Sequence, residues 1–134
     1  MTEGKATSIL VVDDDPSALD IVRTYLESRG YRVATAADGK EALAKLEEVR
    51  PALILLDIMM PGMDGWEVAR VVKNHPDFAD TRVVMLTARS DFADKQQGLS
   101  AGVDDYIVKP IRLHELGDRV ERNLEAREAR RRSA

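Results

Sequence analysis

A chain of 134 residues can enclose one hydrophobic core, and a composition of 44% hydrophobic and 33% charged residues describes a globular domain, not a disordered segment. The lack of cysteine excludes disulfides, thiolate metal sites and a cysteine nucleophile. The net charge of −4 argues against general nucleic-acid binding, and no apolar run approaches the roughly 18 residues of a membrane span. The initial "MTEGKATS" lacks the apolar core of a signal peptide, so we expect a cytoplasmic protein with no membrane contact.

Five short apolar runs along the chain predict the strands of the fold. They are "SILVV" (8–12), "RVATA" (32–36), "LILL" (53–56), "RVVML" (82–86) and "YIV" (106–108). The first, third and fourth runs are nearly continuously apolar. This pattern is typical of parallel strands that are buried on both faces of a sheet.

The first two helical segments have clear start signals. Asp15 is a suitable N-cap before Pro16, which fits the first turn of a helix, and Gly30 is a natural stop. In the second segment, Asp38 and Glu41 have the spacing of a capping box. The side chains expected to face the core are Ala18, Ile21, Val22, Tyr25 and Leu26, followed by Ala42, Leu43 and Leu46.

The remaining helical segments differ in the apolar surface that they offer. The third segment repeats the capping arrangement with Asp64 and Glu67 and is expected to bury Val68, Val71 and Val72. Residues 91–101 have a thin apolar stripe, Phe92 and Leu99. The last helix has a fuller stripe, consisting of Leu113, Leu116, Val120 and Leu124. Beyond that stripe the chain is mostly Ala, Arg and Glu, so we expect this end to project into solvent.

The alternation of strands and helices predicts an α/β fold of the doubly wound (βα)5 type. Right-handed crossovers place helices on both faces of a five-stranded parallel sheet, for which we expect the order 2-1-3-4-5. We predict a flexible N-terminus over residues 1–7, one domain over 8–126, and a charged helix end or tail over 127–134.

Polar side chains follow four of the predicted strands. Asp13 and Asp14 come after the first strand, Asp57 after the third, Thr87 after the fourth and Lys109 after the fifth. Crowded carboxylates raise each other's pKa unless a positive charge compensates, and Mg²⁺ with oxygen ligands does so well. A carboxylate in such a site can be the nucleophile of phosphoryl transfer. The sequence therefore predicts a phosphoryl-accepting aspartate at the carboxyl edge of the sheet.

Four motifs occur in order at the predicted strand ends. They are "VVDDDP" (11–16), "LLDIMMPGMDG" (55–65), "LTA" (86–88) and "DYIVKP" (105–110). With these motifs the chain resembles the receiver domain of two-component response regulators over about residues 8–126. The resemblance implies the flavodoxin-like receiver fold and a signalling switch in a phosphorelay, which assists its own phosphorylation and dephosphorylation but is not an enzyme.

The resemblance assigns roles around the acidic site. Asp57 is the expected phosphoryl acceptor. Asp14 is expected to bind Mg²⁺ (or Mn²⁺) directly and Asp13 mostly through water, while Met59 offers its backbone carbonyl to the metal. Asp15 is interpreted as the helix cap and not as a metal ligand.

The resemblance also assigns the switch. Thr87 is expected to hydrogen-bond the phosphoryl oxygen, and Lys109, beside a cis Lys109–Pro110 peptide bond, pairs with it. Tyr106 is the expected switch aromatic, which moves inward when Thr87 shifts toward the phosphate. Arg89 has two open interpretations, namely a residue that screens or contacts the phosphate and a solvated arginine.

The resemblance implies protein partners. A histidine kinase or phosphotransfer protein is expected to deliver the phosphoryl group, docking near the first helix. The face formed by the fourth helix, fifth strand and last helix is then expected to contact a downstream protein or output domain, or a second copy of the chain. No direct contact with nucleic acid is expected, and the run "REARRR" (127–132) is interpreted as a solvated helix end.

Three functional hypotheses compete. The chain can be a stand-alone receiver, or the receiver part of a longer regulator with a DNA-binding or enzymatic output domain. The third hypothesis is a phosphatase with an aspartyl-phosphate intermediate. Such enzymes typically need a second acid two residues after the nucleophile, where this chain has Met59.

Overall fold

The computed structural model describes residues 7–58, 62, 64–87 and 102–133. Five strands form one parallel sheet in the order β2-β1-β3-β4-β5. The strands are β1 (Ser8–Val12), β2 (Arg32–Ala36), β3 (Leu53–Asp57), β4 (Arg82–Thr87) and β5 (Asp105–Val108). The predicted fold class and strand order are confirmed, and β3, β4 and β5 are each one residue longer than expected.

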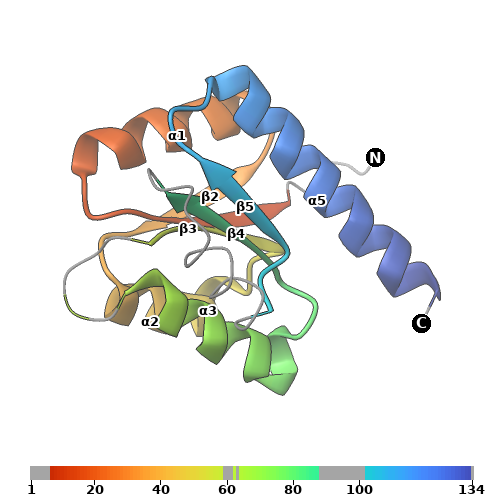
Figure 1. Cartoon of the computed structure of the whole chain (residues 1–134). Helices are drawn as coiled ribbons and strands as arrows, with labels where there is room; N and C mark the ends of the chain where they lie inside the picture. The colour runs from red at the N-terminus through yellow and green to blue at the C-terminus, as the bar shows by residue number, and fades with distance from the viewer. Residues whose placement is uncertain (1–6, 59–61, 63, 88–101, 134) are drawn as a thin grey trace.

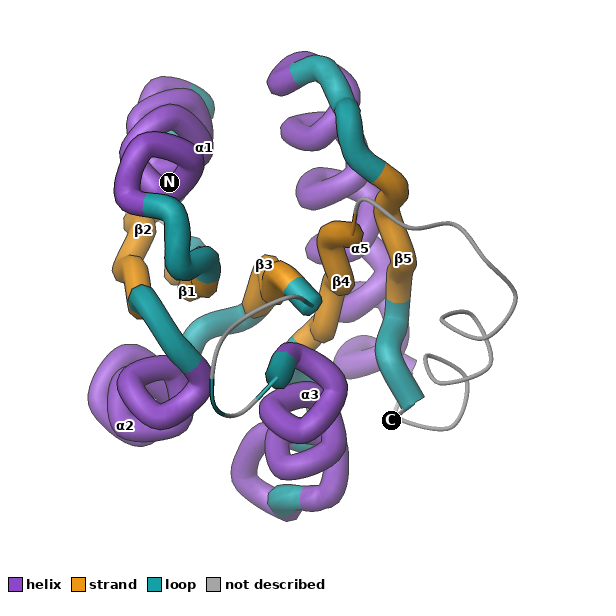
Figure 2. Tube along the Cα trace, turned by 60° about the vertical axis from the view of Figure 1, so that its left-hand side comes forward, coloured by secondary structure: helices purple, strands orange, loops and turns teal. Residues whose placement is uncertain are grey.

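Helices cover both faces of the sheet. They are α1 (Pro16–Ser28), α2 (Gly39–Val49), α3 (Gly65–Asn74), the short 3₁₀ helix η1 (Pro76–Phe78) and α5 (Leu113–Ser133). Helices α1 and α5 lie on one face, and α2 and α3 lie on the other (Figure 1; Figure 2 shows the strands nearly end-on). The expected helix within 91–101 falls outside the described residues. Every described helix is too short or too polar to cross a bilayer.

The predicted capping residues start their helices. The carboxylate of Asp15 accepts a hydrogen bond from the Ser17 N–H at 3.0 Å, and Asp64 and Glu67 form a complete capping box. Asp38 caps α2 by accepting from the Glu41 N–H at 2.8 Å. The Glu41 carboxylate, however, accepts from the Ala37 N–H and not from that of Asp38, so the capping box predicted for α2 is only half correct.

Two hydrophobic clusters hold the helices on the sheet. One lies between the sheet and α2 and α3, and the other lies between the sheet and α1 and α5. Strands β1, β3 and β4 are buried almost throughout, as predicted.

Two side chains expected in the core are exposed instead, Ile21 by 55% and Val71 by 43%. In each helix the next residue takes the inward position, because successive side chains point about 100° apart around a helix. Val72 is fully buried and Val22 packs against the core.

Candidate functional site

The carboxyl ends of β1 and β3 bring three carboxylates together. Val12 is paired with Leu56 across the two parallel strands, so Asp13 and Asp57, the next residues, lie side by side. Carboxylate oxygens of Asp13, Asp14 and Asp57 all lie within 4.8 Å of one another. Asp13 and Asp57 are only 7% and 8% exposed, whereas Asp14 is exposed. The structure therefore assembles the predicted acidic cluster, with one member open to solvent.

Lys109 lies across the crevice from these carboxylates. Its Nζ is 3.5 Å from Oδ2 of Asp57 and 3.9 Å from Oδ2 of Asp13. The Lys109–Pro110 peptide bond is cis, as the resemblance implies. Thr87, at the end of β4, is completely buried, and its carbonyl accepts a hydrogen bond from the Lys109 N–H at 2.6 Å. The hydroxyl and ammonium expected in the site thus reach the same edge of the sheet.

The electrostatics of Asp13 reflect this crowding. Burial raises the pKa of Asp13 above its ordinary value, and the neighbouring Asp57 adds to the increase. A hydrogen bond from the Asp15 N–H, at 3.0 Å, and the charge of Lys109 act in the opposite direction but do not outweigh burial. The site therefore disfavours the charged form of Asp13, mainly because this carboxylate is buried.

The donor set fits a hard divalent cation. All the available ligand atoms are carboxylate oxygens, which Mg²⁺ prefers, and exposed Asp14 leaves a route for an ion and its waters. Among the described residues, the cluster consists of Asp13, Asp14 and Asp57, and Asp15 is occupied as the cap of α1. Met59, whose carbonyl was expected to complete the ligand set, lies outside the described residues, as does Arg89.

Gly65 has a role at this site that the sequence analysis did not assign. A Cβ at residue 65 would lie 2.5 Å from the carbonyl oxygen of Asp57 and 2.9 Å from Cα of Ile58. The Gly65 N–H also donates to the carbonyl of Ile58 at 3.1 Å. Only glycine allows the first turn of α3 to approach the end of β3 this closely. The signal was a glycine at the first position of a helix, directly after its cap.

Tyr106 lies against Trp66 on the side of the sheet covered by α3. The two rings are stacked, with centroids 6.3 Å apart and planes 15° from parallel. Tyr106 is half-buried and packs against the core cluster, whereas Trp66 is 3% exposed. Trp66 is thus part of the core cluster, and it contacts the expected switch residue.

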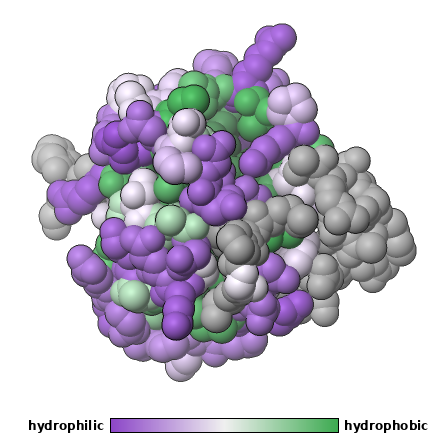
Figure 3. Space-filling view, turned by 90° about the vertical axis from the view of Figure 1, so that its left-hand side faces the viewer, coloured by the Kyte–Doolittle hydropathy of each residue, from purple (hydrophilic) through white to green (hydrophobic). Residues whose placement is uncertain are grey.

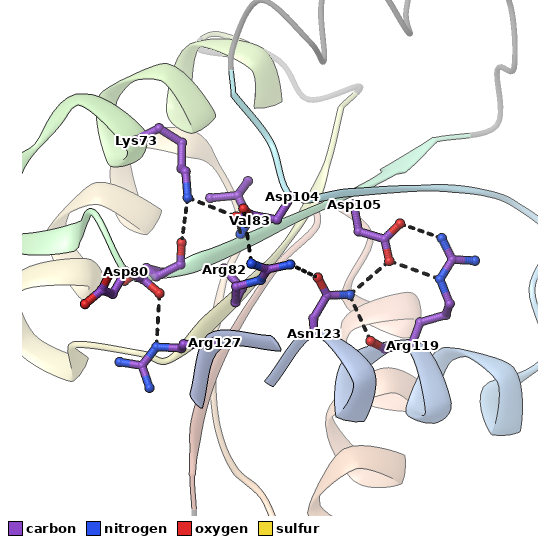
Figure 4. A network of polar contacts seen from close by, with 10 residues as sticks. Lys73, Asp80, Arg82, Val83, Asp104, Asp105, Arg119, Asn123 and Arg127 are labelled. Atoms are coloured by element: carbon purple, nitrogen blue, oxygen red, sulfur yellow. Dashed lines mark hydrogen bonds and ion pairs between the residues drawn. The ribbon is translucent and has the colours of Figure 1, made fainter. Parts of the chain in front are cut away.

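A polar network beside Tyr106 joins β5 to α5. Arg119 donates to both carboxylate oxygens of Asp105, at 2.5 and 3.0 Å, and the side-chain amide of Asn123 donates to the same carboxylate at 2.9 Å (Figure 4). Burial alone would raise the pKa of Asp105, but the hydrogen bonds from Arg119 and Asn123 hold it below its ordinary value. This carboxylate is fully compensated.

The network continues toward α3 through the amino end of β4. Arg82 donates to Oδ1 of Asn123 at 3.1 Å and lies 3.6 Å from the carboxylate of Asp104. Asp104 also accepts from Lys73 at 2.9 Å and from the backbone of Val83 at 2.8 Å (Figure 4). The sequence analysis missed these partners, which lie up to 41 residues apart.

The molecular face toward the carboxylate crevice is mainly hydrophilic. In Figure 3, hydrophobic residues appear as small patches between charged and polar ones, outside the area that grey atoms cover. Such a face offers charge and hydrogen bonds more than a broad apolar contact surface.

This arrangement of sheet, acidic cluster and lysine defines a doubly wound α/β domain with a candidate cation and phosphate site. The sequence model of the response regulator receiver domain matches residues 9–121, and the chain belongs to this family.

Relatives and solved structures support the same family assignment. The chain is 45% identical to the DNA-binding response regulator MtrA of Mycolicibacterium smegmatis, over 90% of this chain and 51% of the relative. A receiver domain protein (CheY-like) of Methanospirillum hungatei has a TM-score of 0.89 at 32% identity, covering 94% of this chain and 99% of that one. The TrrA protein of Thermotoga maritima, solved in complex with Mg²⁺-BeF, has a TM-score of 0.78 at 34% identity, covering 87% and 98%. The chain spans about half the length of the curated relatives that it matches.

Proposed function

We propose that Asp57 accepts a phosphoryl group from the phosphohistidine of a histidine kinase or phosphotransfer protein. The observation that carries the proposal is the cluster of Asp13, Asp14 and Asp57 with the Nζ of Lys109 3.5 Å from Asp57. Phosphoryl transfer depends mostly on positioning and on neutralising charge, which this set of groups can supply.

The transfer step makes one bond and breaks one. A carboxylate oxygen of Asp57 attacks phosphorus in line, and the electron pair of the breaking N–P bond returns to the imidazole nitrogen of the donor. Asp14 and Asp13 would hold Mg²⁺ (or Mn²⁺), which when bound neutralises the charge between the carboxylates and the phosphoryl oxygens. Lys109 and Thr87 would donate to phosphoryl oxygens. The similarity to TrrA, which was solved with Mg²⁺-BeF, supports this assignment.

The positions of Thr87 and Tyr106 support a conformational switch. Movement of Thr87 toward the phosphoryl group would alter the end of β4, because its carbonyl is bonded to Lys109. Tyr106, paired with Met85 on β4 and stacked on Trp66, would then change position and reshape the face of β5 and α5. The readout is a shift of population between two conformations. In this role the chain assists its own phosphorylation and dephosphorylation but remains a switch.

The second part of the proposal concerns the whole protein. MtrA is named a DNA-binding response regulator, and this chain matches 51% of its length. We therefore favour the receiver part of a longer cytoplasmic regulator, with an output domain beyond helix α5. A stand-alone receiver that contacts a downstream protein, or forms a dimer through the face of β5 and α5, is the alternative. The length of the encoded reading frame distinguishes the two.

Replacing the acceptor tests the proposed chemistry. Asp57→Asn should abolish labelling by a small-molecule phosphodonor in the presence of Mg²⁺, because the amide cannot form an acyl phosphate. Asp20→Asn, at an exposed aspartate of α1, is the matched control and should leave labelling unchanged. Acid-labile phosphate that persists in Asp57→Asn would refute the assignment, and turnover of phosphate esters would revive the phosphatase hypothesis.

A further inference from the structure

A second charged region lies at the opposite edge of the sheet, where β3 and β4 begin. A hollow of about 160 Å³ is bordered there by Arg50 and Pro51, by residues 76–81, and by Arg127 and Arg131 of α5. We propose that this hollow binds a phosphate group through the guanidinium groups of Arg50, Arg127 and Arg131. The proposal goes beyond the phosphotransfer proposed for Asp57 and does not depend on it.

Arg50 occupies an unusual backbone position. Its φ of 50° is left-handed, and it is the one non-glycine with positive φ among the residues that the structure describes. This position caps the C-terminus of α2, where glycine or asparagine is preferred. The guanidinium lies 5.5 Å from the ring centroid of buried Phe78, which fixes it at the rim of the hollow.

Arg127 brings a second guanidinium to the hollow. Its Nε donates to the carbonyl of Asp80 at 3.0 Å, which anchors the half-buried side chain (Figure 4). Burial, and then the neighbouring charge of Arg131, lower the pKa of Arg127 below its ordinary value. An anion held between Arg127 and Arg131 would relieve this repulsion.

Three other cations near this edge are already compensated. Lys73 and Arg82 share the carboxylate of Asp104, and Arg119 is paired with Asp105. By contrast, no carboxylate in the described part of the chain lies within ion-pair distance of Arg50 or Arg131. Arg127 lies 3.7 Å from the exposed Glu128 and also feels the charge of Asp80.

The balance of charge in the hollow is positive. Two exposed aspartates, Asp77 and Asp80, also line the hollow, so its lining residues carry three guanidiniums and two carboxylates, a net charge of +1; the carboxylate of Glu128, 3.7 Å from Arg127, lies outside the lining. Within the described residues, Arg50 and Arg131 of the lining thus lack the carboxylate partners that Lys73, Arg82 and Arg119 have.

The residues that line the hollow indicate which ligand it would bind. All three cations are arginines, whose planar guanidinium matches the oxygens of phosphate with paired hydrogen bonds. A volume of about 160 Å³ is below the roughly 300 Å³ at which pockets for drug-sized ligands begin. The expected occupant is thus a single phosphate group, either inorganic phosphate or the end of a phosphate monoester.

NMR titration of the ¹⁵N-labelled chain with inorganic phosphate tests the proposal. The titration uses a chelator in place of Mg²⁺, constant ionic strength set by chloride, and an Asp57→Asn background, so that the carboxylate crevice does not contribute. We expect saturable shifts at Arg50, Thr81 and Arg127. A parallel titration with methyl phosphate distinguishes the sources, since tighter binding of the ester identifies a phosphorylated molecule as the ligand.

A matched pair of neighbouring arginines provides the control. Arg131→Gln, in the lining, should weaken phosphate binding about tenfold, the effect of losing a charge-assisted hydrogen bond. Arg132→Gln removes the same charge from an exposed residue outside the lining and should change the affinity by less than about twofold. Arg50→Gly should also weaken binding, and it keeps the fold because glycine accepts the left-handed conformation.

Two results would overturn the proposal. Shifts that do not saturate would show that the hollow holds no ligand. Equal weakening by Arg131→Gln and Arg132→Gln, together with tighter binding of a short DNA duplex than of phosphate, would show a diffuse basic surface for nucleic acid instead.

Discussion

The pKa values of aspartates at the two ends of the sheet are shifted in opposite directions. At the carboxyl edge, Asp13 and Asp57 face one ammonium, and burial raises the pKa of Asp13. At the other end of the sheet, Asp105 is half-buried, and hydrogen bonds from Arg119 and Asn123 hold its pKa below the ordinary value although burial alone would raise it. The ion-paired Asp105 thus joins β5 to α5, whereas the crowded carboxylates at the carboxyl edge form a candidate cation site.

Breaking the compensated pair should have the largest effect on stability. Asp105→Ala removes the acceptor shared by Arg119 and Asn123, so Arg119 loses its ion pair while Asn123 keeps its bonds to Arg82 and to the Arg119 carbonyl. We expect the free energy of unfolding to fall by about 3 kcal/mol, measured by urea denaturation. Asp77→Ala, at an exposed aspartate, is the control and should stay within about 0.5 kcal/mol of the wild type.

Acid titration gives a second measure of the same pair. A carboxyl group whose pKa is lowered by folding stabilises the native state above its unfolded pKa, and this contribution disappears as the pH falls through the folded pKa. The wild type should therefore lose stability in the acid range more steeply than Asp105→Asn. Identical slopes would mean that Asp105 is not held ionised by the network.

A side chain placed between α3 and Asp57 should have the next largest effect on stability. Gly65→Ala places a methyl group 2.5 Å from the Asp57 carbonyl, against backbone that cannot move freely. We expect a loss of about 2 kcal/mol in unfolding free energy and slower phosphorylation of the displaced Asp57. Gly117→Ala is the matched control, because its nearest neighbour is the end of the flexible Arg29 side chain. If both variants cost the same, close packing at residue 65 is not the reason for the glycine.

Asp13→Asn, in the acidic cluster, should increase stability and weaken Mg²⁺ binding. In the absence of divalent cations, Asp13→Asn should be about 1 kcal/mol more stable than the wild type at neutral pH, because a buried ionised carboxylate is removed. The sign follows from a pKa raised by folding, which penalises the native state above that pKa and not in acid. The same variant should bind Mg²⁺ roughly 10- to 100-fold more weakly. Calorimetry with and without Mg²⁺ measures both effects, and a variant that loses stability in both conditions would contradict the account.

The sequence predicted the carboxyl edge well because each of its residues is local to a strand end. Asp13, Asp57 and Lys109 follow apolar runs, and parallel strands deliver such residues to one edge once their order is known. The N-cap role of Asp15 could also be predicted, because it depends on residues two positions apart.

The polar network at the opposite end of the sheet could not be predicted in the same way. Asp104 meets Lys73 across 31 residues and Asn123 meets Arg82 across 41, and no periodicity specifies such pairs. The exposure of Val71 had a similar origin, because apolar neighbours within one helix compete for a single inward direction and the sequence does not show which one wins. Met59 and Arg89 remain predictions.

Locating the phosphoryl group on the chain tests the central claim most directly. After labelling with a small-molecule phosphodonor and Mg²⁺, borohydride reduction converts an aspartyl phosphate into homoserine, which peptide mass spectrometry assigns to a position. The account predicts homoserine at residue 57 only, and only when Mg²⁺ is present. Homoserine at residue 13 or 14, or equal labelling of the wild type in a chelator, would contradict it.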